Sequence, residues 1–327
     1  MSKTYKYLFG PVPSRRLGRS LGVDLTPFKT CTLDCIFCQL GHTTNKTIER
    51  AEYMPLAEIK TELEAWIQQD GKADYITLSG SGEPTLHSRF GDILQFIRDH
   101  TAIPAALLSN GTLFSMPEVR EAAKRADLVK LSLSAWNQVS FEHLNRPHAD
   151  LRFSQIMEGY RAFRDGFKGM LWIEVFLVPG VNTLRNDAEK IAAFVEALNP
   201  DEIHLNTAVR PPAEEFALAM PQSEMESLTG LFRPVAKVIA EFSPEASDEV
   251  MANEETILAM LKRRPCTAQQ IARVFGMHLN EVSKYLGKLL RMGKICAQGS
   301  ESSPYYSAAK SGAQEIPYDI TSSKKEI

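Results

Sequence analysis

Short apolar runs alternate with amphipathic stretches six times between residues 20 and 242. Each run is rich in branched residues and bounded by Gly, Pro or polar residues, which is typical of a strand covered by helices. In the stretches between them, apolar residues recur every three or four positions, as on one face of an amphipathic helix. The predicted strands span 20–26, 74–79, 103–109, 128–134, 171–178 and 202–207, and the clearest helical faces span 56–66, 90–97, 153–163 and 191–198.

This alternation predicts an α/β fold with a parallel sheet, because consecutive strand–helix units join through right-handed crossovers. Six units, where a closed barrel has eight, indicate an open, partial (β/α)6 TIM-type barrel. The loops that follow the strands then gather on one rim, where the active site of such a fold lies.

The periodicity changes after the polar connector at 241–250. Three short helices are predicted there, followed by a two-stranded wing with a Gly/Ser tip, which is the element order of a winged helix-turn-helix. The helices span 255–264, 267–276 and 279–293, and the wing spans 294–308. The predicted division is a core domain at 1–245, a winged helix-turn-helix domain at 246–312 and a tail at 313–327, whose last residues, 321–327, are expected to be frayed.

Composition is that of an ordinary globular protein, since 44% of the 327 residues are hydrophobic and 24% are charged. No apolar run approaches the roughly 20 residues that cross a bilayer, and residues 1–16 lack the apolar core of a signal peptide. A cytoplasmic location without membrane association is therefore expected. Five cysteines, odd in number and clustered, are a poor disulfide framework and favour metal binding or catalysis.

Charge is unevenly distributed along the chain, whose net charge is −3. Residues 253–300 hold eight Lys/Arg and three Asp/Glu, a balance of +5, so the remainder carries −8. The third predicted helix of this module has an apolar stripe of Leu279, Val282, Leu286 and Leu289, opposite a polar face of Asn280, Lys284, Lys288 and Arg291. Such a face either contacts a polyanion such as nucleic acid or is solvated. Cys266 and Cys296 in the same module are expected to be small buried residues.

Three cysteines, Cys31, Cys35 and Cys38, follow the first predicted strand with C-x3-C-x2-C spacing. A redox pair would need two of them, and structural zinc needs four ligands, of which His42 could be the fourth. Three thiolates on one short loop also suit a [4Fe-4S] cluster with one iron that lacks a protein ligand. A small molecule can be chelated at that iron.

The motif C-x3-C-x-aromatic-C, with Phe37 before the last cysteine, resembles that of the radical S-adenosylmethionine (SAM) superfamily. The resemblance covers roughly residues 7–242 and implies a partial (β/α)6 barrel, a [4Fe-4S] cluster on the three cysteines and SAM on the open iron. It also implies an external one-electron donor of the flavodoxin or ferredoxin type. One electron would split SAM into methionine and a 5′-deoxyadenosyl radical, which abstracts hydrogen from substrate. Phe37 would pack beside the adenine or cluster, or serve loop packing alone.

The segment SGSGEPTLH, residues 79–87, follows the second predicted strand. It resembles the GGE element of the superfamily, in which backbone and acid hold the amino group of SAM, although Ser81 replaces the first glycine. The resemblance assigns this role to Ser81, Gly82 and Glu83, with Gly80 supporting the turn.

Polar residues follow the later predicted strands, and by the same resemblance they would bind the ribose or carboxylate of SAM. Each could equally be a helix cap or a turn former. These residues are Ser109, Asn110, Ser132, Ser134, Arg146 and Asn182. On the last strand, one of His204, Asn206 and Arg210 could face substrate, although a lone histidine beside a strand is more often a satisfied core residue.

Arg15, Arg16 and Arg19 precede the first predicted strand, where they either grip an anionic substrate or form a solvated basic loop. Together with GEPTL and an Arg-Pro pair, this segment resembles the Fe–S oxidoreductase branch that includes the tRNA wyosine-base synthases. Those enzymes carry further cysteines upstream, whereas residues 1–30 contain none.

These patterns lead to one principal functional hypothesis and two alternatives. The principal hypothesis is a radical SAM enzyme that acts on an RNA base, with the winged helix recruiting the substrate or a partner. An activase that places a radical on a protein or peptide is the alternative within enzymes. An iron–sulfur redox-sensing DNA-binding regulator is the alternative from another class, but it would need neither the six-unit barrel nor the SGSGEP turn.

Overall fold

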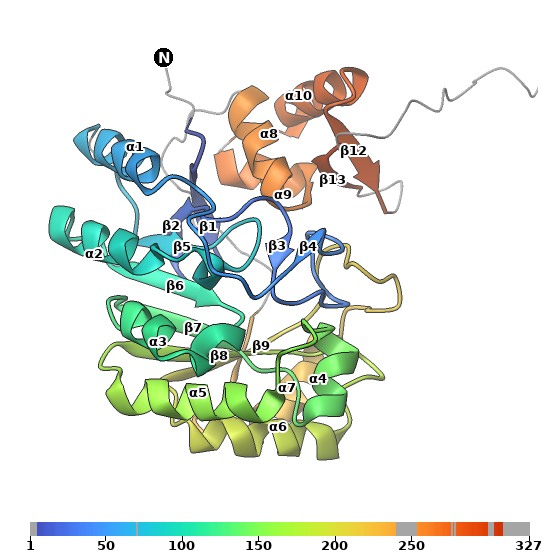
Figure 1. Cartoon of the computed structure of the whole chain (residues 1–327). Helices are drawn as coiled ribbons and strands as arrows, with labels where there is room; N and C mark the ends of the chain where they lie inside the picture. The colour runs from blue at the N-terminus through green and yellow to red at the C-terminus, as the bar shows by residue number, and fades with distance from the viewer. Residues whose placement is uncertain are drawn as a thin grey trace, which may run out of the picture.

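The computed structural model describes residues 5–69, 71–239, 254–275, 277, 279–299 and 304–309 (Figure 1). The predicted connector at 241–250, the Gly/Ser tip of the wing at 300–303 and the tail at 313–327 lie outside the described residues. Among the described helices, none is both long and apolar enough to cross a membrane.

An eight-stranded sheet, in the order β1-β2-β5-β6-β7-β8-β9-β10, forms the centre of the molecule. The six predicted strands are confirmed as its middle, and they pair in parallel with one another in chain order. They are β2 (Gly18–Val23), β5 (Tyr75–Leu78), β6 (Ala105–Ser109), β7 (Leu128–Ser132), β8 (Met170–Phe176) and β9 (Glu202–Asn206). The prediction of an α/β fold with a mostly parallel sheet is therefore confirmed.

The two edge strands were not predicted. β1 (Leu8–Ser14) pairs antiparallel with β2, and its register shifts between Phe9 and Val12. Its sequence, LFGPVPS, reads as a loop because proline cannot donate to a strand ladder, yet an edge strand tolerates proline. At the other edge, β10 (Lys237–Val238) has two residues, too few to produce a periodic pattern.

Helices follow the strands along the chain, and their apolar faces are buried as predicted. For example, Ile59, Leu63 and Trp66 of the first helix and Tyr160 and Phe163 of the fifth lie in one large hydrophobic cluster. The helices are α1 (Leu56–Gln68), α2 (Phe90–His100), α3 (Pro117–Ala123), α4 (Gln138–Asn145), α5 (Phe153–Gly166), α6 (Arg185–Ala197) and α7 (Gln222–Thr229).

The C-terminal part has a separate hydrophobic cluster, built from three helices and a three-stranded sheet in the order β11-β13-β12. The three predicted helices and the two strands predicted after them are present, and the two-residue strand β11 is additional. The elements are α8 (Glu254–Arg263), β11 (Cys266–Thr267), α9 (Ala268–Phe275), α10 (Leu279–Arg291), β12 (Ile295–Gln298) and β13 (Tyr305–Ala308).

Two expectations for this part need correction. Val282, Leu286 and Leu289 are buried, but Leu279 is exposed because it is the first residue of α10 and lies at the end of the apolar stripe. Cys266 is buried as expected, whereas Cys296 is half-buried.

The C-terminal part packs on the N-terminal edge of the large sheet (Figure 1). The guanidinium of Arg263, at the end of α8, lies 4.5 Å from the ring centroid of Phe9 in β1. The hydroxyl of Tyr305 in β13 donates a 2.7 Å hydrogen bond to the carbonyl of Val209, which follows β9. Consequently, residues from both ends of the chain meet beside the carboxyl ends of the parallel strands.

Candidate functional site

The three predicted cysteines lie on a loop that follows β2 and is fastened at both ends. Its first residues, β3 (Thr30–Cys31), pair in parallel with β4 (Asn45–Lys46) at its far end. Inside the loop, the amide of Cys38 donates to the carbonyl of Cys35 over 3.1 Å, which forms a tight turn. The loop therefore presents all three thiols from a short, closed segment.

Each of the three thiols accepts a hydrogen bond from a side chain on a different segment. The donor–sulfur distances are 3.5 Å from Asn110 Nδ2 to Cys31, 3.2 Å from Asn145 Nδ2 to Cys35 and 3.1 Å from Lys29 Nζ to Cys38. Such contacts orient sulfur ligands and stabilise negative charge on them.

Asn110 was predicted at the site, but Lys29 and Asn145 were not. Lys29 stands two residues before Cys31, and its backbone adopts a left-handed φ of 58° while its side chain is buried. Asn145 ends α4, more than one hundred residues away in sequence. The positive charge of Lys29, two residues before Cys31, was the one sequence feature that could have indicated a donor to the thiols. No feature of the sequence around Asn145 indicated its contact with Cys35.

Burial of their sulfur atoms is the main influence on the pKa values of two of the thiols, Cys31 and Cys35. It raises the pKa of Cys31 to about 12, with a further contribution from the charge of Glu83. Burial also raises the pKa of Cys35, assisted by the charges of Cys38 and Cys31. Thiols in this environment become thiolates only beside a strongly positive partner such as a metal.

The donor set fits a cluster better than a single metal ion. Within the described parts of the chain, no group of three or more His, Cys, Asp or Glu side chains could hold a single metal ion. A cubane cluster takes its thiolate ligands on separate irons, so it does not need sulfurs that converge on one point. The ring of His42, the possible fourth zinc ligand, is over half exposed and lies 3.5 Å from Asp34 Oδ2 and 4.0 Å from Glu214 Oε1.

The turn at Ser81–Glu83 packs directly on the cysteine loop. The amide of Lys29 donates to the carbonyl of Ser81 over 2.7 Å, and the amide of Glu83 donates to the carbonyl of Thr30 over 3.1 Å. A Cβ on Gly82 would lie 1.9 Å from that Thr30 oxygen, so glycine is required there by close approach of two backbones.

Replacing Gly82 by alanine is expected to destabilise the fold by about 3 kcal/mol, because a backbone oxygen cannot swing aside as a flexible side chain can. Urea unfolding followed by circular dichroism measures this change. Gly230→Ala is the matched control, since nothing lies within 4 Å of the added methyl group and its φ is −70°. If Gly82→Ala unfolds at the wild-type urea concentration, the proposed close approach is wrong.

Glu83 connects this turn to the end of β6. Its buried carboxylate accepts hydrogen bonds at Oε1 from Thr85 N, Thr85 Oγ1 and Ser109 Oγ, and at Oε2 from Asn110 N over 2.7 Å. It thereby holds Asn110 in reach of Cys31. Oε1 is fully occupied by three donors, whereas Oε2 has one donor and can accept another.

Ser134 and Asn182, two further predicted residues, fasten the ends of β7 and β8. Asn182 is fully buried, accepts from the amide of Val178 and donates to the carbonyls of Ser134 and Phe176. Ser134 Oγ accepts from the amide of Phe176 over 2.9 Å. The ring of Phe37 stacks on Phe176, with centroids 4.0 Å apart. Phe176 therefore links the cysteine loop to this pair.

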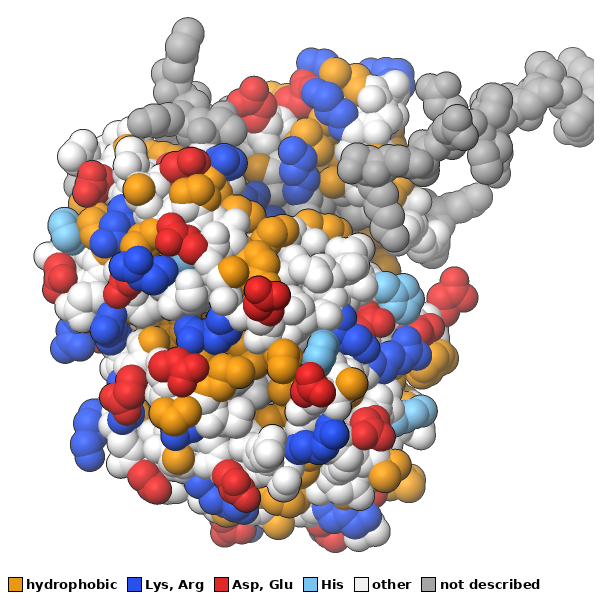
Figure 2. All heavy atoms as spheres, in the orientation of Figure 1, with side chains coloured by type: hydrophobic (Ala, Val, Ile, Leu, Met, Phe, Trp, Pro, Cys, Tyr) orange, Lys and Arg blue, Asp and Glu red, His pale blue; other side chains and the backbone are white. Residues whose placement is uncertain are grey.

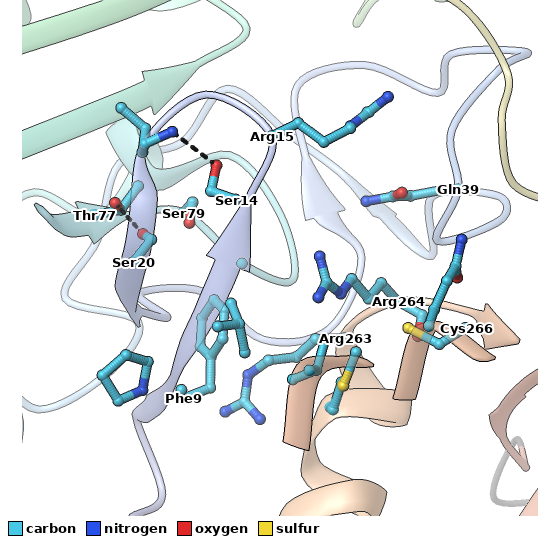
Figure 3. A pocket seen from close by; sticks show the side chains of 18 of the residues that line it. Phe9, Ser14, Arg15, Ser20, Gln39, Thr77, Ser79, Arg263, Arg264 and Cys266 are labelled. Atoms are coloured by element: carbon cyan, nitrogen blue, oxygen red, sulfur yellow. Dashed lines mark hydrogen bonds between the residues drawn. The ribbon is translucent and has the colours of Figure 1, made fainter. Parts of the chain in front are cut away.

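A cavity of about 1040 Å³ adjoins the cysteine loop (Figure 3). Phe37, Cys38 and Gly80 line it near the loop, and the far wall comes from α8 and the residues that follow it. Arg15 and Arg16 line the cavity as expected for residues that grip an anion, whereas Arg19 lies outside it and pairs with the exposed Asp74.

Residues predicted on the last strand divide between the cavity and the core. Asn206 and Arg210 line the cavity. His204 is buried instead, with Nε2 2.9 Å from Glu202 Oε2, and burial lowers its pKa. The remaining two candidates have local partners: Ser132 Oγ accepts from Lys130, and Arg146 pairs with Glu214.

Comparison with known proteins agrees with this geometry. Residues 25–195 match the model of the Radical SAM superfamily. Over 307 residues the chain is 32% identical to a UPF0026 protein of Methanocaldococcus jannaschii, a match that covers 91% of this chain and 94% of that protein. Over 295 residues it is 37% identical to a protein named GTPase Obg from Brachyspira hyodysenteriae, covering 89% of this chain and 43% of the length of that relative.

The solved structure of a radical SAM methyltransferase from Sphaerobacter thermophilus superposes with a TM-score of 0.51 at 17% identity, covering 67% of this chain and 65% of that one. Similarity at this level of identity shows a shared fold and nothing finer. The family match over residues 25–195 and the similarity to the UPF0026 relative account for the cysteine pattern. The chain belongs to the radical SAM superfamily and to the UPF0026 family.

Proposed function

We propose that Cys31, Cys35 and Cys38 hold a [4Fe-4S] cluster and that the protein uses it to cleave SAM reductively and abstract hydrogen from a substrate. Members of the superfamily are enzymes that use this cluster and SAM and take electrons from an external donor. The observation that carries the proposal is the set of three thiols on one short loop, each of which accepts a hydrogen bond from a different side chain. Bound cluster and SAM would supply a 5′-deoxyadenosyl radical.

In this proposal the chain's own residues hold and polarise the ligands. Lys29 places a positive charge beside Cys38, and the amides of Asn110 and Asn145 donate to the other two sulfurs. Three protein ligands leave one of the four irons for a small chelating ligand.

SAM is proposed to lie along the turn that packs on the cysteine loop. Ser81, Gly82 and Glu83 would hold its amino group, because Oε2 of Glu83 retains capacity to accept a hydrogen bond. Gly80 supports the turn through its φ of 148°, and Ser109 anchors the Glu83 carboxylate. Asn110, Ser134, Asn182 and Phe37 complete the proposed contacts.

The wider architecture is proposed to be a partial barrel with a winged helix-turn-helix. Six parallel strands in chain order, from β2 to β9, support the partial barrel at 1–245. The order α8-β11-α9-α10-β12-β13 and a separate hydrophobic cluster support a winged helix at 246–312. The donor of electrons is proposed to be of the flavodoxin or ferredoxin type.

Anaerobic reconstitution tests this function directly. The protein should bind about four irons and release 5′-deoxyadenosine from SAM when a reductant is added. Mass spectrometry of the nucleoside and iron analysis are the measurements. A protein that holds one tetrahedral zinc and forms no 5′-deoxyadenosine would overturn the proposal.

An RNA base is the proposed substrate, and the exposed basic face of α10 favours it. Figure 2 shows Lys and Arg side chains over the C-terminal helices at the top of the view. Lys284 and Arg291 are exposed, whereas Lys288 pairs with Glu254 over 2.5 Å. A kinship with wyosine-base synthases would agree with RNA. The cavity beside Cys38 favours an enzyme over a regulator, because a DNA-binding sensor needs no such space.

Binding of tRNA is expected to weaken in the double variant Lys284→Ala/Arg291→Ala, since two phosphate-contacting cations are lost. The slope of log affinity against log salt should fall in magnitude by about 2. Filter binding over a salt series measures it. Arg161→Ala/Lys168→Ala removes the same charge from exposed positions on the large domain and should bind as wild type. Unchanged binding in the α10 variant would favour a protein or peptide substrate.

A further inference from the structure

Arginines from three distant segments gather in the cavity between the strand ends and the C-terminal part. Arg15 comes from the turn between β1 and β2, Arg210 from the segment after β9, and Arg264 from the residue that follows α8. Figure 3 shows Arg15 and Arg264 around one space, beside Gln39, to which Arg210 donates a 2.7 Å hydrogen bond. The electrostatic influence of Arg210 and Arg264 on Arg15, whose pKa is lowered to about 10 chiefly by burial, agrees with this proximity.

Positive charge in this cavity is not balanced by the described residues. Seven Lys or Arg residues and two Glu residues line it. One of those acids, Glu174, is already engaged by Arg16, Lys130 and Asn206. Cations therefore outnumber carboxylates in the lining, and Glu174 is engaged by residues other than Arg15 and Arg210.

Of the three arginines from distant segments, Arg15 and Arg210 have buried nitrogens without partners among the described residues. Arg15 Nη1 and Arg210 Nε are shielded from solvent and have no hydrogen-bond partner among the described residues. The other contact of Arg210 is to a neutral amide, that of Gln39. Unpaired buried guanidinium groups are costly, and a fork of nitrogens matches the oxygens of a phosphate or carboxylate.

We propose that Arg15, Arg210 and Arg264 bind an oxyanion group, phosphate or carboxylate, of the substrate. The assignment of this anion to the substrate depends on the function proposed above, whereas anion binding itself does not. Cys38 and Gly80 line the same cavity, so a substrate anchored on the arginines shares its space with the cysteine loop. Because Arg264 follows α8, the C-terminal part supplies one wall of the substrate site.

Thermal unfolding of the full chain in inorganic phosphate or in acetate, at constant ionic strength with chloride, tests the site without SAM or reductant. Wild type should be stabilised saturably by at least one of the two anions. Stabilisation by phosphate alone identifies a phosphate group, and stabilisation by acetate alone identifies a carboxylate. If neither anion stabilises the protein more than chloride does, the oxyanion site is wrong.

Arg15→Gln should lower the affinity for the stabilising anion roughly tenfold or more, because one charge-assisted contact is lost. Its melting temperature without anion should stay equal to that of wild type or rise, since the variant removes an unpaired buried charge. A purely structural role for Arg15 would lower that temperature instead. Arg264→Gln should behave alike, and Arg161→Gln, at an exposed position on α5, should bind as wild type.

Wild-type affinity in both cavity variants would overturn the proposal. Formation of 5′-deoxyadenosine is measured separately, so failure of the anion site and failure of the proposed radical chemistry give different results. Absence of anion binding by the wild-type protein, with intact 5′-deoxyadenosine formation, would refute the oxyanion site alone.

Discussion

Cys35→Ala is expected to reduce 5′-deoxyadenosine formation to background and to lower bound iron well below about four per chain. The physical reason is that two thiolates cannot replace three: the cluster would lose the ligand that accepts from Asn145. Iron analysis and the absorbance of the anaerobically reconstituted protein report the cluster, and chromatography reports the nucleoside. Circular dichroism checks that the fold is retained.

Cys296→Ala is the matched control for this experiment. Cys296 is half-buried on β12 in the C-terminal part, where its sulfur lies 3.3 Å from Ser307 Oγ. Its removal should leave iron content and 5′-deoxyadenosine unchanged. Retention of both in Cys35→Ala would contradict the assignment of the cysteine loop as the cluster site.

Glu174→Gln is expected to destabilise the fold by about 3–5 kcal/mol at pH 7, because it leaves half-buried Arg16 and buried Lys130 without their carboxylate. Glu174 is 8% exposed, and Asn206 donates to it as well. The free energy of unfolding in urea measures the loss. Glu189→Gln, which breaks an exposed pair with Arg185, should cost about 1 kcal/mol or less.

The loss of stability in Glu174→Gln is expected to depend on pH. Burial alone would raise the pKa of Glu174, but the charges of Arg16 and Lys130 outweigh it and hold that pKa well below 4.5. Because the folded pKa is depressed, the stabilisation is fully present above pH 4.5 and is lost as the pH falls toward the folded pKa. The gap between wild type and Glu174→Gln should therefore narrow in acid. A small gap that does not change with pH would show that the carboxylate is not ionised in the fold.

The ion pairs of Glu174 with Arg16 and Lys130 also affect the charge of the cavity. The single negative charge of Glu174 is shared between Arg16 and Lys130, which line the same cavity as Arg15 and Arg210. A substrate oxyanion is then the natural partner for the remaining arginines. The three loop arginines thus differ: Arg16 pairs with Glu174, Arg15 has a buried nitrogen without a partner among the described residues, and Arg19 pairs with the exposed Asp74.

Local sequence patterns were sufficient to predict the elements whose structure depends on residues a few positions apart. Strand β8 and helix α5 were predicted because branched residues in a short apolar run and apolar residues at helical spacing act within a few positions. Strand β1 was not predicted from its sequence pattern, because its prolines are typical of a loop. Its position at the edge of the sheet, where proline is tolerated, depends on the tertiary structure. The cysteine spacing was visible in the sequence because all three cysteines lie within eight residues.

By itself, then, the sequence determined the parallel α/β core, the helices of the C-terminal part and the loop that carries Cys31, Cys35 and Cys38. Only the tertiary structure brought Asn145 to Cys35 and placed Arg15 and Arg264 in one cavity. Periodicity and spacing report contacts among residues a few positions apart. Convergence of residues separated by more than one hundred positions depends on how the elements pack, and no local pattern encodes it.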